Sequence, residues 1–299
     1  APPAAPVGAG TATTATTGSA SSTGWVMSGL EVTAQAPAGP LQVLWQDERL
    51  VAVHKPAGWL VHRTWLDAHE TRFVMQTLRD QLGRHVYPVH RLDKGTSGVL
   101  VMALDPDAAR AMTQLFETRQ TSKDYVALVR GWPAPEVRVD HALKPDDAPD
   151  DALPQDAVTR FQRLATLQLD VPVDRYPSTR VALVQAQPET GRRHQIRRHL
   201  KHLAHPIIGD ATHGKGAHNR WWAEQLGQQR LWLHAGRLAF VHPFSGQGVE
   251  ITSDWRDPAL NADWCQLQRD WPWRFEPTRA DEGDGTAQAV IADGSSPAA

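Results

Sequence analysis

The chain has 299 residues, enough for one large domain or two small ones, and a formal charge of −2. Its single cysteine, Cys265, excludes an intrachain disulfide and a cysteine-rich zinc site. The sequence has no run of 18 apolar residues, no Sec-type signal and no arginine-rich transit peptide, so we expect a cytoplasmic protein without a membrane span.

The two ends of the chain differ in composition from the middle. Residues 1–40 are mostly Ala, Pro, Gly, Thr and Ser, and residues 276–299 are rich in Gly, Ala and acidic side chains. Neither end has the apolar periodicity that would offset the entropy of ordering, so we predict two disordered tails. The predicted folded domain, residues 41–275, holds 30 of the 31 Lys and Arg residues and 27 of the 33 Asp and Glu residues, a formal charge of +3.

Apolar runs and turn residues predict the elements of the first half. In chain order these are paired strands at 41–45 and 50–54, a helix over 71–82, a strand over 99–104, a helix from 106 and a strand over 125–129. Gly83 is a typical residue after a helix C-terminus, while Asp105 ahead of Pro106 is a typical helix start.

The second half begins with an acidic loop at 144–156. Paired strands over 158–169 and 180–187, a helix over 191–203 and strands over 231–233 and 238–241 are predicted to follow. Strands outnumber helices, and most connections have the length of hairpin links. We therefore predict an α+β fold, with one domain built on a largely antiparallel mixed sheet with flanking helices.

The segment His90–Leu100 contains the first candidate for chemistry. It places Asp93 between Arg91 and a Gly/Ser turn, directly before an apolar strand. A neighbouring cation favours the charged form of a carboxyl, and an ionised Asp acts as a nucleophile or as a base. An Arg-x-Asp pair on a loop is more often a surface ion pair of little energetic value, so this segment alone leaves both interpretations open.

The second candidate is a basic stripe over residues 192–201. It carries five cations and no acid, namely Arg192, Arg193, Arg197, Arg198 and Lys201. Gly191 is expected to open the helix, whose cation-rich first turns would attract a phosphate or a carboxylate. Arg197 follows apolar Ile196, and a buried Arg needs an anionic partner, for which Asp93 is a candidate. A solvated basic helix face is the alternative.

Tyr125 is the third candidate, in the strand that precedes Gly131. On the residues alone, it either packs in the core or offers a ring on which a base can stack.

These segments, taken together and in this order, resemble the pseudouridine synthases related to the ribosomal large-subunit synthase A. The matching motifs are Lys55-Pro-Ala-Gly58, His90-Arg-Leu-Asp93, Lys123-x-Tyr125, Gly191-Arg-x-His-Gln-Ile-Arg197, Leu233-His-Ala235 and His242-Pro243. The resemblance covers about residues 41–255. It implies the fold of that family and isomerisation of an RNA uridine to pseudouridine.

The resemblance also implies a role for each site residue. Asp93 would be the essential catalytic residue, Arg91 would help displace the base, Tyr125 would stack on the uracil and Arg197 would pair with Asp93. Further segments, among them Trp59–Asp67 and Arg175–Arg180, resemble the branch of the family that modifies uridine 65 in the tRNA acceptor stem. The expected contacts to the RNA come from Arg192, Arg193, Arg198, Lys201 and Lys55.

No cofactor and no metal are expected. The sequence has neither a G-x-G-x-x-G motif nor a P-loop, and His199, His202 and His205 lack the spacing of a zinc site. We expect a monomer whose partner is its tRNA substrate.

Three alternatives remain. A ribosomal-RNA pseudouridine synthase would share every motif. A glycoside hydrolase would need a second catalytic carboxylate, and none stands out near the three segments. A non-catalytic RNA-binding module would keep the basic stripe without needing Asp93.

Overall fold

The computed structural model describes residues 39–62, 72–146, 148–149 and 151–277. Within this part of the chain, eleven strands form one sheet. The order of its main path is β1(Val43–Gln46), β2(Leu50–Lys55), β4(Ser97–Ala103), β9(Leu233–Val241), β5(Thr121–Arg130), β8(Thr179–Pro188), β7(Val158–Leu169) and β11(Arg274–Phe275). Off this path, β3(Tyr87–Pro88) pairs with β4, β6(Glu136–Asp140) with β7 and β10(Gly248–Thr252) with β9.

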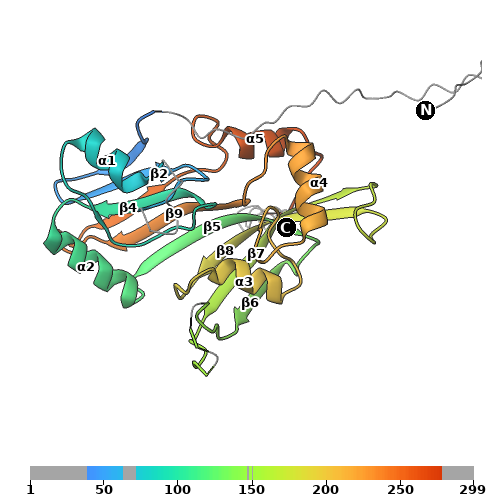
Figure 1. Cartoon of the computed structure of the whole chain (residues 1–299), viewed down its shortest axis with the longest axis horizontal. Coiled ribbons are helices and arrows are strands. Elements are labelled where there is room, and N and C mark those ends of the chain that lie inside the picture. Colours follow the sequence, from blue (N-terminus) through green and yellow to red (C-terminus); the bar gives the residue numbers. More distant parts are fainter. Residues whose placement is uncertain (1–38, 63–71, 147, 150, 278–299) are drawn as a thin grey trace, which may run out of the picture. The chain divides into compact units, whose positions relative to one another are not determined.

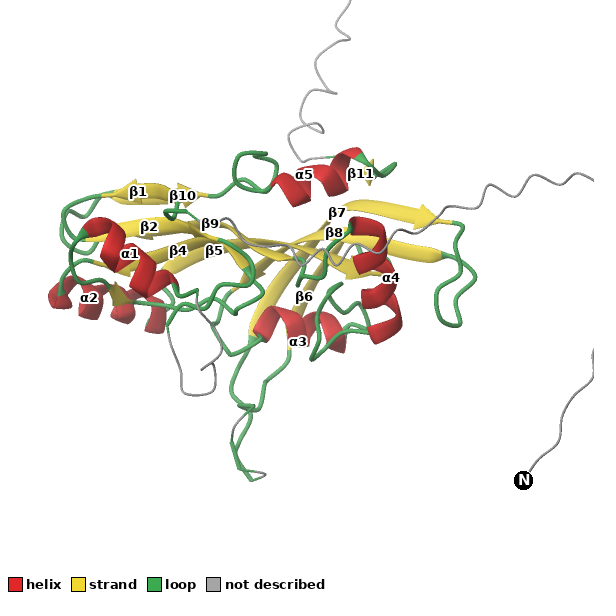
Figure 2. Cartoon of the chain, turned by 45° about the horizontal axis from the view of Figure 1, so that its top comes forward, coloured by secondary structure: helices red, strands yellow, loops and turns green. Residues whose placement is uncertain are grey.

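The strand pairs of this sheet are antiparallel except β4–β9, which is parallel. The prediction of an α+β fold on a largely antiparallel mixed sheet is therefore confirmed. Five helices accompany the described sheet: α1(Val74–Leu82), α2(Pro106–Glu117), α3(Gln195–His202), α4(Gly216–Leu226) and α5(Ala262–Arg269). Figure 1 labels these elements, and in Figure 2 α3 and α4 lie on one side of the sheet and α5 on the other.

The first half of the sheet is buried on both faces, as its continuous apolar runs require. Val51 and Val53 of β2 pack with α1, while the alternate residues Leu50 and Ala52 pack with α2. The larger second core lies around β5, β7 and β8 and includes three fully buried tryptophans: Trp222, Trp232 and Trp264.

Several local predictions are confirmed. Gly83 ends α1 in the left-handed region with a φ of 64°, and the Asp105 side chain accepts a hydrogen bond from the Ala108 backbone N–H at the start of α2. The strand pair β7–β8 connects through the turn at 170–178. The predicted start of the first helix at 71 lies outside the described residues, and the described helix begins at Val74.

Two predicted boundaries are wrong. Helix α3 begins at Gln195 rather than at Gly191, because His194 adopts the left-handed region (φ 54°) and the Gln195 side chain accepts the Arg192 backbone N–H at 2.9 Å. The predicted strands 231–233 and 238–241 belong to one strand, β9, which begins only at Leu233 and runs through Gly236. The helices α4 and α5 are not among the predicted elements.

The predicted tails lie outside the described residues, apart from 39–40 and 276–277. Glu276 contributes to the fold: its backbone N–H donates to the Leu164 carbonyl, and its carboxylate accepts a hydrogen bond from Arg163 at 2.8 Å. Among the described helices, none combines the length and the apolar character needed to cross a membrane.

Candidate active site

Asp93 lies in the turn that leads into β4, and the structure holds this turn from two sides. Its backbone carbonyl accepts the Thr96 N–H at 3.0 Å, and the Gly58 N–H donates to the next carbonyl, that of Lys94, at 2.9 Å. The Asp93 side chain is 20% exposed, so its carboxylate remains open to a substrate.

The Lys55 side chain holds the same turn through hydrogen bonds to its backbone. Its side chain has no exposed surface, and its Nζ donates to the carbonyls of Pro56 and Lys94, each at 3.0 Å. Burial, and then the charge of Arg230, lower the pKa of Lys55 to about 7. A side chain without exposed surface cannot reach a phosphate, so the prediction that Lys55 contacts RNA is wrong and the residue supports the Asp93 turn instead.

A buried polar chain fixes the strand that follows the turn. The Arg230 guanidinium donates to the Ser97 hydroxyl at 2.9 Å, and this hydroxyl lies 2.9 Å from His234 Nδ1. Because His234 Nε2 faces the Ser253 carbonyl at 2.7 Å, it must carry the proton, so Nδ1 accepts from Ser97. Burial lowers the pKa of His234 to about 3, consistent with a neutral ring.

Gly98 lets β4 approach β9 closely. Its φ is 112°, and a Cβ atom at this position would lie 2.1 Å from the Ala235 carbonyl oxygen. Only glycine therefore permits the parallel contact of Ser97 and Gly98 with β9, which brings the Asp93 turn close to β5.

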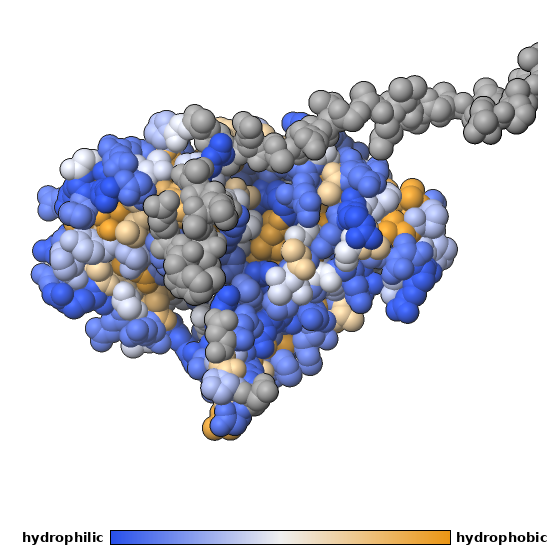
Figure 3. Space-filling model, in the orientation of Figure 1, coloured by the Kyte–Doolittle hydropathy of each residue, from blue (hydrophilic) through white to orange (hydrophobic). Residues whose placement is uncertain are grey.

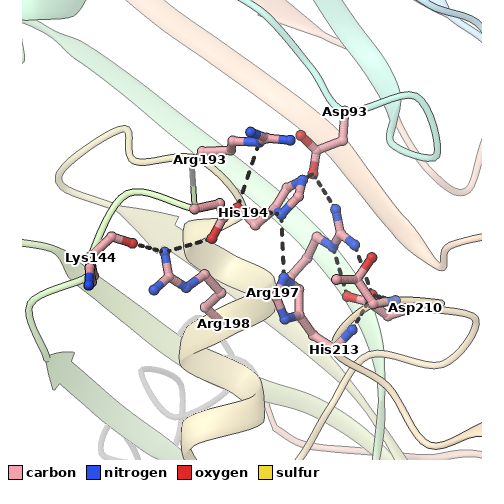
Figure 4. Close-up of polar contacts among 10 residues, drawn as sticks. Asp93, Lys144, Arg193, His194, Arg197, Arg198, Asp210 and His213 are labelled. Carbon is pink, nitrogen blue, oxygen red and sulfur yellow. Dashed lines mark hydrogen bonds and ion pairs between the residues drawn. The ribbon is translucent and has the colours of Figure 1, made fainter. Parts of the chain in front are cut away.

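Arg197 links Asp93 to a second carboxylate (Figure 4). Its Nη1 donates to Asp93 Oδ2 at 2.9 Å, while its Nε and Nη2 donate to the two oxygens of Asp210 at 2.7 and 2.8 Å. The predicted contact between Arg197 and Asp93 is therefore present. Burial would lower the pKa of Arg197, but its bonds to Asp210 and Asp93 outweigh that effect and raise it, so the guanidinium stays charged.

Asp210 is a site residue that has no role among the sequence predictions. It is 1% exposed, and it also accepts the backbone N–H groups of Thr212 and His213 at 2.9 and 2.8 Å. Burial alone would raise the pKa of Asp210, but these donors and Arg197 lower it below the usual value. A carboxyl that stays ionised and buried cannot donate a proton to a leaving group, which argues against the glycoside hydrolase alternative.

Tyr125 lies on β5 between the two cores and pairs with Ala186 and Ala235 on the neighbouring strands. Burial and then the charge of Asp93 raise its pKa, so the phenol is neutral and near the carboxylate. Arg91 is exposed on the loop before Asp93. Asp93, Arg197 and Tyr125 thus come together from three segments that are far apart in the chain.

The basic stripe divides into two groups. Arg197 is buried, while Arg192, Arg193, Arg198 and Lys201 keep some exposed surface. Over α3, the face seen in Figure 3 is mostly hydrophilic. Since Arg192 and Arg193 precede α3, they do not form its first turns as predicted.

An acidic side chain of the 144–156 loop lies against this stripe. The carboxylate of Asp146 is 3.1 Å from His194 Nδ1, 3.3 Å from Arg198 Nη1 and 3.6 Å from Arg193 Nε. Arg198 also donates to the Lys144 carbonyl at 2.7 Å, and Arg192 donates to the Asp156 carbonyl at 3.0 Å. The stripe and the acidic loop, which are separate in the sequence, therefore neutralise each other in part.

The His194 ring lies between the carboxylates of Asp93 and Asp146. Its Nε2 lies 3.7 Å from Asp93 Oδ2, on the other side of the ring from Asp146. Its Nδ1 is also 3.3 Å from His213 Nε2. Burial lowers the pKa of His194, although Asp93 and Asp146 oppose that effect. In the 199–205 segment, His199 and His205 lie within hydrogen-bond distance of the carbonyls of His141 and Arg130, and the His202 ring stacks on that of His141.

Comparison with known proteins decides the class of this site. The family described as RNA pseudouridylate synthase matches residues 49–202, just over half of the chain. The chain belongs to the RNA pseudouridylate synthase family. The expected fold and the expected class of enzyme, an RNA pseudouridine synthase, are thereby confirmed.

The individual proteins that this chain resembles are also pseudouridine synthases. The tRNA pseudouridine synthase C of Salmonella typhi is 48% identical over 241 residues, which cover 78% of this chain and 91% of the relative. That of Pasteurella multocida is 49% identical over 240 residues, covering 78% and 97%. Among solved structures, Human RNA Pseudouridylate Synthase Domain Containing 1 matches with a TM-score of 0.61 and 25% identity, covering 83% of this chain and 95% of that one.

Proposed function

We propose that this synthase converts a uridine of tRNA to pseudouridine, with acceptor-stem uridine 65 as the target, and that Asp93 is its catalytic residue. The observation that carries the proposal is the Asp93 carboxylate, 20% exposed and held at 2.9 Å by the buried Arg197. The tRNA substrate rests on the relatives named tRNA pseudouridine synthase C, which match more than three quarters of the chain.

The reaction breaks the bond between C1′ of the ribose and N1 of the uracil. A base inside a stem must first leave the helical stack to reach a side chain. Asp93 then attacks or deprotonates the ribose, the freed uracil turns, and C5 bonds to C1′. C5 loses its proton and N1 gains one, so no oxidant, reductant or cofactor enters the balance.

Each neighbour has a proposed part in this step. Arg197, fixed by Asp210, holds the Asp93 carboxylate in one position, because its Nε and Nη2 are already bound to Asp210. Tyr125, as a neutral phenol beside Asp93, offers a ring for the uracil to stack on. Arg91, exposed on the same loop, helps displace the base. Arg192, Arg193, Arg198 and Lys201 contact phosphates.

Mapping pseudouridines in the RNA of cells that lack the protein tests the substrate. The proposal predicts that one tRNA acceptor-stem pseudouridine disappears and returns when the gene is restored. Loss of a ribosomal-RNA pseudouridine with every tRNA position unchanged would contradict it and would favour the ribosomal-RNA alternative. An unchanged map would favour the non-catalytic RNA-binding module.

A further inference from the structure

The turn between β7 and β8 places Tyr176 against helix α4. The ring centroids of Tyr176 and His218 are 5.9 Å apart, and the two planes are tilted by 53°. His218 is 3% exposed, and burial lowers its pKa, so it remains neutral. An uncharged imidazole ring therefore packs against the tyrosine ring.

Two arginines lie over this ring. The guanidinium carbons of Arg130 and Arg175 are 5.4 and 5.3 Å from the Tyr176 centroid. Arg175 Nη2 also donates to the Tyr176 hydroxyl at 3.2 Å, and Arg130 Nη2 donates to the Ala204 carbonyl at 2.9 Å. Stacking on an aromatic face and one hydrogen bond each fix both guanidiniums while leaving further donors for another group.

Among the described residues, no ion pair neutralises the positive charge of this cluster, to which Lys215 also belongs because its charge acts on the same His218 ring. Within the described residues, no carboxylate oxygen lies within 4.0 Å of Arg130, Arg175 or Lys215. Asp174 is the acid whose charge acts on Arg175. The exposed Arg175 guanidinium and the half-buried Arg130 guanidinium, held by a ring and a carbonyl, suit the oxygens of a phosphate, which accept N–H donors.

The cluster lies on the face of the sheet that carries α3. Lys215, the N-cap of α4, is two residues beyond His213, whose backbone N–H binds Asp210 of the active site. In Figure 2 α3 and α4 lie on one face of the sheet, and the turn after β7 bends toward that side. A nucleic acid with its target base at Asp93 can therefore extend along the same face to Tyr176.

We propose that Arg130, Arg175, Tyr176 and Lys215, together the Tyr176 patch, bind the phosphate backbone of the substrate RNA away from the reacting uridine. This inference rests on the proposed function, because it takes the RNA substrate as the ligand. The patch adds to the affinity of the enzyme for a long RNA. It takes no part in the chemistry.

Filter binding across a salt series tests the patch in the full chain. The probes are a full-length tRNA transcript and a short hairpin that carries only the target stem. Arg175→Gln is expected to raise the Kd for the tRNA about five- to tenfold and to flatten the slope of log K against log salt by about one unit. Its Kd for the hairpin and its single-turnover rate at saturating tRNA should match the unmodified protein.

Arg110→Gln is the matched control, since Arg110 is an exposed arginine on α2 that pairs with Asp107. If Arg175→Gln lowers the melting temperature of the protein, Lys215→Gln replaces it as the test variant. An Arg175→Gln or Lys215→Gln protein that binds tRNA as tightly as the control overturns the proposal, as does an equal loss on the short hairpin. Failure of the unmodified protein to form pseudouridine would refute the proposed function instead, because the patch is scored by binding alone.

Discussion

Two basic surfaces differ in whether a carboxylate faces their cations. They are the basic stripe, which lies before and within α3, and the Tyr176 patch. In the stripe, Arg193 and Arg198 face the carboxylate of Asp146. In the patch, Arg130 and Arg175 face a tyrosine ring and a carbonyl. Local density of Lys and Arg in a sequence is therefore a poor measure of the charge that a surface offers to RNA, since an acid from another segment can neutralise it.

Arg197 differs from its neighbours in the stripe and should give the largest effect. Arg197→Gln removes the three charged donors that join Asp93 to Asp210, so the Asp93 carboxylate loses its fixed position. Misplacement of a reacting group by 1 Å costs about 100-fold in rate, and we expect at least that loss in single-turnover rate. The Kd for tRNA should change much less.

Arg198→Gln is the comparison for that experiment, because Arg198 lies one residue further and pairs with Asp146 instead of Asp93. It should change the Kd by a few-fold at most and leave the rate unaltered. An Arg197→Gln protein that loses affinity but keeps its rate would refute the pairing as a catalytic requirement.

Asp146 provides the next test. If its carboxylate competes with phosphates for Arg193 and Arg198, Asp146→Asn should bind tRNA about two- to fivefold more tightly, as expected for a surface ion pair worth up to about 1 kcal/mol. The salt dependence of binding should become steeper, since more cations are then available to phosphates.

A double-mutant cycle sharpens the comparison between the two regions. Arg193→Gln should have a larger effect on the Kd in the Asp146→Asn background than in the unmodified protein. The effect of Arg175→Gln should be the same in both backgrounds. Equal effects of Arg193→Gln in both would show that Asp146 does not compete with RNA.

The smallest effect is expected from the ends of the chain. We propose that residues 39–277 contain all that catalysis needs, a range close to the predicted domain of 41–275. A protein shortened to this range should fold and keep its turnover on tRNA. Loss of turnover with unchanged thermal stability would assign the ends a part in RNA binding.

The parts of the fold that the sequence predicted depend on local patterns. Gly83 and Asp105 mark helix ends through backbone conformation and capping, and both signals are contained within a few residues. The predicted start of α3 is too early, because a run of cations carries no information on backbone angles. Its position depends on the left-handed His194 and on hydrogen bonds to the Gln195 side chain.

The prediction of the site from the sequence is limited in the same way. The pairing of Arg197 with Asp93 was expected from the resemblance and from the need of a buried Arg for an anion. The role of Asp210 and the burial of Lys55 depend on how distant strands meet, and no local pattern in the sequence encodes that. The contact of Asp146 with the stripe likewise joins residues 47 or more positions apart.

Tritium release from tRNA labelled at C5 of uridine tests the central claim most directly, because the reaction replaces the bond to that hydrogen with one to the ribose. We predict that Asp93→Asn, which keeps the size of the side chain and removes its charge, releases no tritium above background and binds tRNA within a few-fold of the unmodified protein. Release at a rate close to that of the unmodified protein would contradict the assignment of Asp93 as the catalytic residue.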